Sequence, residues 1–173
     1  MTLSREIFRQ YDVRGIVGRD LTAETAYVLG RAYAAYLANG GASGPVVVGR
    51  DNRPSGGELR DALVRGLTEC GVDVIDIGQV PTPLLYWSLN HLAVAGGIQV
   101  TGSHNPPEYN GFKLSLGTAS IHGEQIQEIK RQISRTLGLD PLAFKGHRDI
   151  SLKGVGARHI ASIMQKPIRP IGE

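Results

Sequence analysis

Several features that define large protein classes are missing from this sequence of 173 residues. It has a single cysteine, Cys70, which excludes an internal disulfide framework and is typical of a reducing cytoplasm. No stretch approaches the roughly 20 apolar residues of a membrane span. The first six residues also lack the apolar core of a signal peptide. We therefore expect a cytoplasmic protein that has no membrane partner.

Common catalytic motifs are absent as well. The sequence has no Gly-x-Ser-x-Gly elbow, which argues against an α/β-hydrolase. It also has no Walker A motif and no Gly-x-Gly-x-x-Gly fingerprint. The five histidines show no metal-ligand spacing, and one cysteine cannot build a zinc site.

The charge pattern does not indicate a nucleic-acid partner. Residues 1–129 carry 10 basic and 13 acidic side chains, whereas residues 130–173 carry 9 basic and 3 acidic ones. The basic residues of the second segment are dispersed, and Phe144 is its only aromatic residue, unlike the dense basic stripe of a nucleic-acid binder. A solvated helix face and linker is the favoured interpretation. A surface that meets an acidic partner is the alternative.

What the sequence does contain is an alternation of extended and helical patterns. Short apolar runs predict strands, and apolar residues at helical spacing predict helices. The predicted strands cover 45–48, 72–77, 97–101 and 112–116, and the predicted helices cover 23–38, 56–70, 83–92 and 124–137. This order implies an α/β sheet with helices on its faces. We expect one domain over 1–138, followed over 139–173 by a linker and a short helix at about 155–164.

The helix ends carry recognisable signals. Thr22 and Thr82 are predicted N-caps, and Ser55 with Glu58 has the form of a capping box. Gly71 stands where a C′ glycine is expected.

The most informative loop covers residues 101–107, directly after a predicted strand. Ser103 could act as a nucleophile or a phosphate carrier, and the neighbouring His104 could transfer a proton. From these residues alone an ordinary Asn-Pro turn is the favoured alternative.

Two arginine-containing segments and one lysine extend this set. Tyr11 and Arg14 lie in a predicted glycine-terminated turn, and residues 49–53 follow a predicted strand. Arginines in such loops suit phosphate. The alternative is that Arg50 and Asp51 pair with other loops and hold the sheet edge together, which is the better interpretation for Asp51. Lys113 could act as an acid or base or neutralise phosphate, or be an ordinary surface lysine.

Four ordered motifs resemble the α-D-phosphohexomutase family, and most closely its bacterial phosphomannomutase/phosphoglucomutase branch. The motifs cover residues 8–15, residues 49–56, residues 80–83, and residues 101–106 with 110–113 close behind. The resemblance implies a three-layer α/β/α mixed sheet, the first of the four domains of such an enzyme.

The resemblance also implies a mechanism for interconverting hexose 1-phosphates and 6-phosphates. Ser103 would carry a phosphoryl group and pass it to the sugar through a bisphosphorylated intermediate, with hexose 1,6-bisphosphate as activator. Mg²⁺ would be bound by the phosphoserine and by aspartates of a second domain. Arg14 and Lys113 would neutralise the moving phosphate, His104 would lie beside the substrate hydroxyls, and Tyr11 would line the site. Gly15, Gly49, Gly102 and Gly111 fall in the expected phosphate-handling loops.

The sequence departs from the family in its extent. The Asp-Gly-Asp-x-Asp metal loop and the sugar- and phosphate-binding loops of the later domains are absent. We expect the chain to depend on domains II–IV for turnover and to have little mutase activity alone. The alternative is a truncated paralogue that binds sugar phosphates or a partner without turnover.

Overall fold

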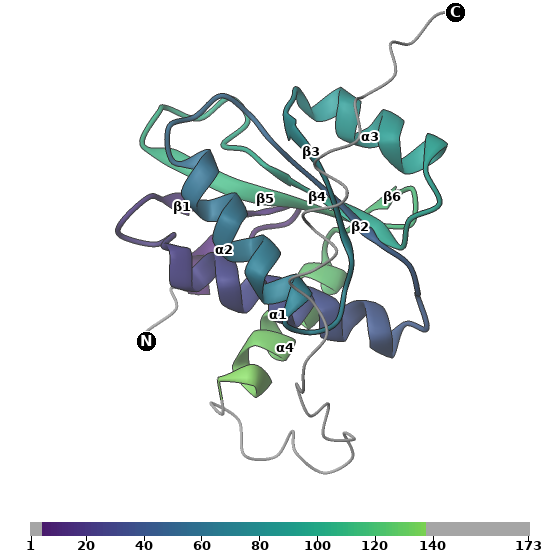
Figure 1. The fold of residues 1–173 in the computed structure, drawn as a ribbon. Coiled ribbons are helices and arrows are strands. Elements are labelled where there is room, and N and C mark those ends of the chain that lie inside the picture. The colour runs from purple at the N-terminus through teal and green to yellow at the C-terminus, as the bar shows by residue number, and fades with distance from the viewer. Residues whose placement is uncertain (1–4, 138–173) are drawn as a thin grey trace, which may run out of the picture.

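The computed structural model describes residues 5–137, which form a six-stranded mixed sheet with helices on both faces (Figure 1). The linker and short helix predicted within 139–173 lie outside these residues. In chain order the elements are η1 (Arg5–Ile7), β1 (Val13–Ile16), α1 (Ala23–Asn39), β2 (Val46–Arg50), α2 (Gly56–Thr68), β3 (Val74–Gln79), α3 (Thr82–His91), β4 (Gly96–Val100), β5 (Tyr109–Leu116), β6 (Ala119–Ser120) and α4 (Glu124–Thr136).

The strand order across the sheet is β1-β5-β4-β2-β3, and the short β6 pairs with the end of β5. β4, β2 and β3 run parallel, whereas β5 runs antiparallel to both β1 and β4. All five residues of β4 and the first four of β2 are buried, because these strands lie in the middle of the sheet and are covered on both faces. This position explains the apolar runs by which the sequence predicted them.

Helices α1, α2 and α4 cover one face of the sheet and α3 covers the other, which confirms the three-layer α/β/α arrangement (Figure 1). Val46 and Val48 join the large core under α1, α2 and α4. Val47 is buried outside that core, and Leu85 and Leu89 are the buried leucines of α3. The alternating direction of side chains along β2 thus supplies both faces of the sheet.

Two glycines allow α1 and α2 to pack with their backbones in contact. A Cβ atom at Gly30 would overlap the carbonyl oxygen of Leu63, and one at Gly66 would overlap that of Tyr27. The absence of a side chain at both positions therefore sets the distance between the two helices.

The cap predictions have mixed outcomes. Thr22 is confirmed as an N-cap, since its hydroxyl accepts a hydrogen bond of 3.2 Å from the backbone N–H of Thr25. The capping box at Ser55 is wrong: this residue has a helical backbone, and its Oγ accepts a hydrogen bond from Asn110 Nδ2 at 2.9 Å. Thr82 is the first residue of α3, and Pro81 takes the cap position.

β1 is the main element that the sequence did not predict. The residues interpreted as a turn form an edge strand, in which Arg14 pairs with Gly111 of β5. A four-residue strand containing Arg14 and Gly15 has no apolar pattern of its own, so its conformation depends on pairing with β5.

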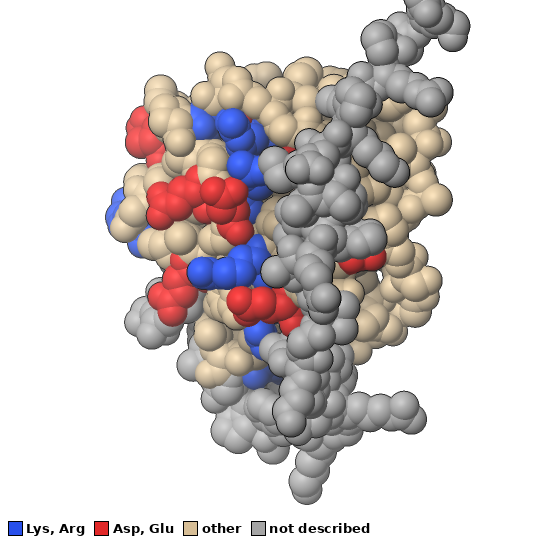
Figure 2. Space-filling view, in the orientation of Figure 1, with Lys and Arg blue, Asp and Glu red and all other residues tan. Residues whose placement is uncertain are grey.

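Charged side chains are unevenly distributed over the visible face. Figure 2 shows acidic and basic groups intermingled on the α2 side, whereas the part that α3 occupies is almost entirely free of them. α3 contains no Asp, Glu, Lys or Arg, and it leaves Leu84 and Trp87 exposed. Across residues 5–137, no helix has both the length and the apolar character needed to cross a membrane.

Candidate active site

The candidate site lies at the edge of the sheet where β2 and β4 end. Residues 101–109, which join β4 to β5 and include the first residue of β5, are called the Ser103 loop. Arg50 and Val100, the last residues of β2 and β4, are paired in register, so the loops that follow both strands meet at this edge. Ligands in open α/β sheets bind at the carboxyl ends of strands.

Ser103 itself has an unusual backbone conformation. Its φ of 55° is the one positive value among the non-glycine residues that the structure describes. The left-handed region costs an L-residue on the order of 1 kcal/mol, so surrounding contacts must hold it there. One such contact is the hydrogen bond of 2.9 Å that the Ser103 N–H donates to Thr101 Oγ1.

Thr101 connects this contact to Asp51. The buried Thr101 hydroxyl donates a hydrogen bond of 2.7 Å to Asp51 Oδ2. Asp51 Oδ1 accepts the backbone N–H of Arg53 at 3.1 Å. The structural role that the sequence predicted for Asp51 is confirmed.

The Arg53 guanidinium holds the Ser103 loop through its backbone carbonyls. Its two terminal nitrogens donate four hydrogen bonds of 2.6 to 3.1 Å, and its Nε donates to Asp51 Oδ2 at 3.2 Å. The four accepting carbonyls are those of Ser103, Asn105, Pro106 and Tyr109. All five N–H groups of the guanidinium are therefore committed to protein partners.

This arrangement corrects the expectation that Arg53 suits phosphate, and it gives Arg50 the structural role that was the alternative. The Arg53 guanidinium donates its hydrogen bonds to the loop and to Asp51. Arg50 donates to Gln79 Oε1 at 2.9 Å and to the Asp51 carbonyl at 3.3 Å. Both arginines brace the edge of the sheet.

Gly102 is the glycine that the Ser103 loop requires. A Cβ atom at this position would overlap the guanidinium of Arg53. The other three glycines expected in phosphate-handling loops, Gly15, Gly49 and Gly111, lie within β1, β2 and β5 instead.

Arg14 and Lys113 reach the same carboxylate. Asp12 is buried, forms an ion pair with Arg14, and lies 3.8 Å from Lys113 Nζ through its Oδ2. Arg14 Nη1 also donates a hydrogen bond of 2.9 Å to Asn105 Oδ1 in the Ser103 loop. Two cations held by one anion give a fixed local excess of positive charge, which suits a phosphate group.

His104 and Tyr11 are exposed. Within residues 5–137, neither the Ser103 hydroxyl nor the His104 imidazole has a hydrogen-bond partner, so the two side chains do not form a nucleophile–base pair here. The Tyr11 side chain is 65% exposed, and its ring lies 6.4 Å from that of His122. The roles expected for both residues remain predictions.

Reasoning from sequence placed Arg53 in a loop suited to phosphate but missed its contact with the Ser103 loop, and it gave Asp12 no role. Arg53 lies in the loop that directly follows the buried strand β2, two positions after Asp51, which was a usable signal. Asp12 lies two residues before Arg14, but its pairing with Lys113 depends on β1 lying beside β5. The residues around Asp12 therefore give no indication of its contact with Lys113.

The residues at this edge do not form a metal site by themselves. No group of three or more His, Cys, Asp or Glu side chains suited to a metal occurs within residues 5–137. Two carboxylates of the site, Asp12 and Asp51, already bind cationic and hydroxyl donors of the protein.

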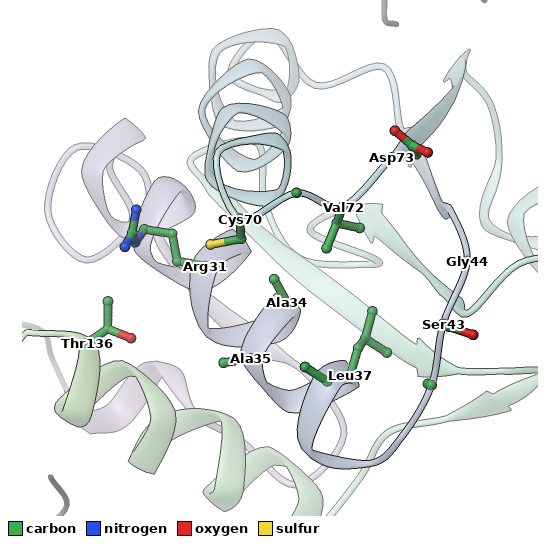
Figure 3. Close-up of a pocket in the computed structure, with 13 residues that line it drawn as sticks. Arg31, Ala34, Ala35, Leu37, Ser43, Gly44, Cys70, Val72, Asp73 and Thr136 are labelled. Atoms are coloured by element: carbon green, nitrogen blue, oxygen red, sulfur yellow. The ribbon is translucent and has the colours of Figure 1, made fainter. Parts of the chain in front are cut away.

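A cavity of about 400 Å³ lies away from this edge (Figure 3). It is lined by the second half of α1 and by the segments that precede β2 and β3, which places it at the amino ends of those strands. Cys70 borders it, and burial raises the pKa of the thiol despite the opposing influence of Arg31. A thiol with a raised pKa is a poor nucleophile, so the cavity offers no catalytic group of that kind.

Residues 5–137 match the family model described as phosphoglucomutase/phosphomannomutase, alpha/beta/alpha domain I. The chain is 50% identical over 135 residues to a phosphomannomutase/phosphoglucomutase of Pseudomonas aeruginosa. That match covers 78% of this chain and 29% of the relative. A phosphoglucomutase of Neisseria gonorrhoeae is 48% identical over 128 residues, which cover 74% of this chain and 28% of the relative.

A solved structure gives the same result. A phosphoglucomutase/phosphomannomutase family protein from Burkholderia thailandensis superimposes with a TM-score of 0.74 and 44% sequence identity. The match covers 79% of this chain and 31% of that structure. The chain thus spans less than a third of the length of these relatives.

Proposed function

Because the chain belongs to the phosphoglucomutase/phosphomannomutase family, with residues 5–137 as its domain I, we propose that it supplies the phosphoryl-carrying serine of a phosphohexomutase. The observation that carries the proposal is the position of Ser103. It lies on a braced loop with a positive φ, and Arg14 is hydrogen-bonded to Asn105 of the same loop. Asp12 holds Lys113 beside Arg14.

The proposed reaction begins with transfer of a phosphoryl group from a hexose 1,6-bisphosphate to Ser103 Oγ. The P–O bond to the sugar breaks, a P–Oγ bond forms, the serine proton passes to a base, and the sugar oxygen takes up a proton. The phosphoserine later donates its phosphoryl group to the free hydroxyl of a hexose monophosphate. After the bisphosphate reorients, its other phosphoryl group returns to Ser103, so that a 1-phosphate becomes a 6-phosphate or the reverse.

The side chains of the site have distinct parts in this scheme. Arg14 and Lys113 stabilise the charge on the transferring group, which is the main contribution of protein to phosphoryl transfer. Lys113 is also the candidate to move a proton at the sugar hydroxyl. His104 and Tyr11 are assigned to the sugar, since both are exposed.

Mg²⁺ would add a Lewis acid that neutralises phosphate oxygens. Among the described residues we assign it one ligand, the phosphate on Ser103, because Asp12 and Asp51 bind protein donors and no group of three or more His, Cys, Asp or Glu side chains suits a metal there. The remaining ligands would have to come from outside residues 5–137, and no step is assigned to the metal here.

The partners follow from the same proposal. The substrate is a hexose phosphate, and the other partners are the remaining domains, II–IV, of a mutase. We assign residues 1–138 to the phosphoserine domain and 139–173 to the entry into the next one. A cytoplasmic location suits a soluble phosphosugar, and neither nucleic acid nor membrane is a proposed partner.

Intact-mass measurement tests the proposal on the whole chain. After incubation with glucose 1,6-bisphosphate and Mg²⁺, we expect one phosphoryl adduct that maps to Ser103. The Ser103→Ala variant should lack it. If the wild-type chain gains no adduct although it binds the sugar phosphate, the acceptor role is overturned in favour of a non-catalytic binding module.

A further inference from the structure

We propose that Arg53 is a positioning residue for phosphoryl transfer: its guanidinium holds the backbone of the Ser103 loop in the conformation that presents Ser103 Oγ. The inference rests on the proposed function and adds to it a residue that does not contact the reacting atoms. Its contacts within residues 5–137 are with the loop backbone and Asp51.

The Arg53 side chain holds the Ser103 loop through several hydrogen bonds at once. Four carbonyls within seven residues of chain converge on one planar cation, and the Arg53 side chain is only 12% exposed. Hydrogen bonds to a charged group are stronger than neutral ones. In addition to its contacts with Arg14 and the backbone, a loop that contains two prolines is thus bound at four carbonyls by a side chain about 50 positions away.

Ser103 is held in its strained conformation on both sides of its Cα. Its N–H is held by Thr101 Oγ1 and its carbonyl by Arg53 Nη2, so both peptide groups beside its Cα are restrained. Thr101 and Arg53 are in turn connected through Asp51 Oδ2. This closed network is the structural reason that a positive φ persists at a serine.

The shape of the loop is specific for a guanidinium group. Gly102 leaves no Cβ at the place where the Arg53 guanidinium lies, so the loop is shaped around this group. A lysine would keep the charge but could not reach four carbonyls and a carboxylate at once, because an ammonium has three donors.

The experiment compares Arg53→Lys and Arg53→Ala with matched changes at Arg131, which lies on α4 and pairs with Glu124 and Glu128. Two quantities are measured on the full chain. The first is hydrogen exchange at the amides of Ser103, Asn105 and Tyr109, compared with amides of α1. The second is the rate at which Ser103 accepts a phosphoryl group from glucose 1,6-bisphosphate, with and without millimolar guanidinium.

We expect both Arg53 variants to exchange the loop amides at least about tenfold faster, with α1 unchanged. We also expect phosphorylation to fall about a hundredfold, in keeping with the sensitivity of transfer to misplacement of a reacting group. Guanidinium should restore part of the rate in Arg53→Ala and none in Arg53→Lys, whose side chain fills the space. The Arg131 variants should match the wild type in every measurement.

The outcomes separate this inference from the proposed function. A wild-type chain that binds glucose 1,6-bisphosphate but is never phosphorylated overturns the acceptor role, and the exchange data alone then decide whether Arg53 orders the loop. Wild-type phosphorylation that persists at its full rate in both Arg53 variants overturns the positioning role. If Arg53→Ala fails to fold, Arg53→Lys carries both measurements, and unchanged loop exchange in it counts against the inference.

Discussion

Arg14 Nη1 donates a hydrogen bond of 2.9 Å to Asn105 Oδ1, although the two residues lie 91 positions apart in the chain. The bond joins edge strand β1 to the Ser103 loop. With the ion pair to Asp12, it fixes the Arg14 guanidinium at two points. The orientation of the cation is therefore set before any phosphate arrives, which is the condition for effective electrostatic stabilisation.

Removing the Asn105 side-chain amide should remove the hydrogen bond that holds Arg14 Nη1. We expect Asn105→Ala to slow phosphorylation of Ser103 about tenfold, equivalent to about 1.4 kcal/mol, while the free energy of unfolding changes little. Asn90→Ala on α3 is the control, since within residues 5–137 the Asn90 side chain donates only to the Tyr86 carbonyl of its own helix. Equal rates in the two variants would show that Arg14 does not depend on Asn105.

The Asp12 carboxylate supplies the counter-charge that allows the Arg14 and Lys113 cations to lie close together. We expect Asp12→Asn to lower the free energy of unfolding by about 2 kcal/mol, because Arg14 and Lys113 then lie together without a counter-charge. Urea denaturation measures the loss, and raised salt should reduce it by screening the two cations. A loss that does not respond to salt would indicate a steric cause.

The contact between α1 and α2 predicts opposite effects for two glycine substitutions in one helix. Gly66→Ala should destabilise the protein by about 1–3 kcal/mol, since the added methyl overlaps the Tyr27 carbonyl. Gly57→Ala should stabilise it by about 0.5 kcal/mol, because the position is helical and a Cβ there meets nothing within 4 Å. Thermal unfolding of both variants by circular dichroism tests the pair, and a stable Gly66→Ala protein would contradict the close approach.

Cys70 should react slowly with iodoacetamide. Burial raises the pKa of its thiol, so at a given pH a smaller fraction is the reactive thiolate than in an unfolded chain. We expect the rate to rise with pH, with its midpoint at a higher pH in the folded chain than in the same chain in urea. A midpoint at lower pH in the folded chain would mean that Arg31 outweighs burial.

Tyr33 anchors α1 to the sheet through its hydroxyl, which donates to the Ser115 carbonyl from a fully buried position. We expect Tyr33→Phe to lower the free energy of unfolding by about 1–2 kcal/mol, because a buried acceptor loses its partner. Tyr86→Phe on α3 is the matched control, with an expected change within about 0.5 kcal/mol. Denaturant titration of the two variants measures the difference.

The residues of the candidate site were largely identifiable from local patterns. Ser103 follows one predicted strand, and Lys113 lies within another. The motif that contains each residue is a short continuous stretch of chain. Lys113 lies within β5 and not at its start, because the strand already begins at Tyr109. The observed strand begins earlier than the predicted one because polar residues such as Asn110 extend it, and these residues show no apolar pattern.

Local periodicity and motif order by themselves determined the buried strands, the four helices and the family resemblance, because each depends on residues close together in the chain. Tertiary structure alone decided that the segment of Arg14 is a strand, that Asp12 holds two cations, and that Arg53 binds the Ser103 loop instead of phosphate. These contacts join residues about 50 to 100 positions apart, and they arise only when the strand order brings β1, β5, β4 and β2 side by side. A side chain that serves a distant backbone leaves no pattern in its own neighbourhood, so its partner is specified by the fold.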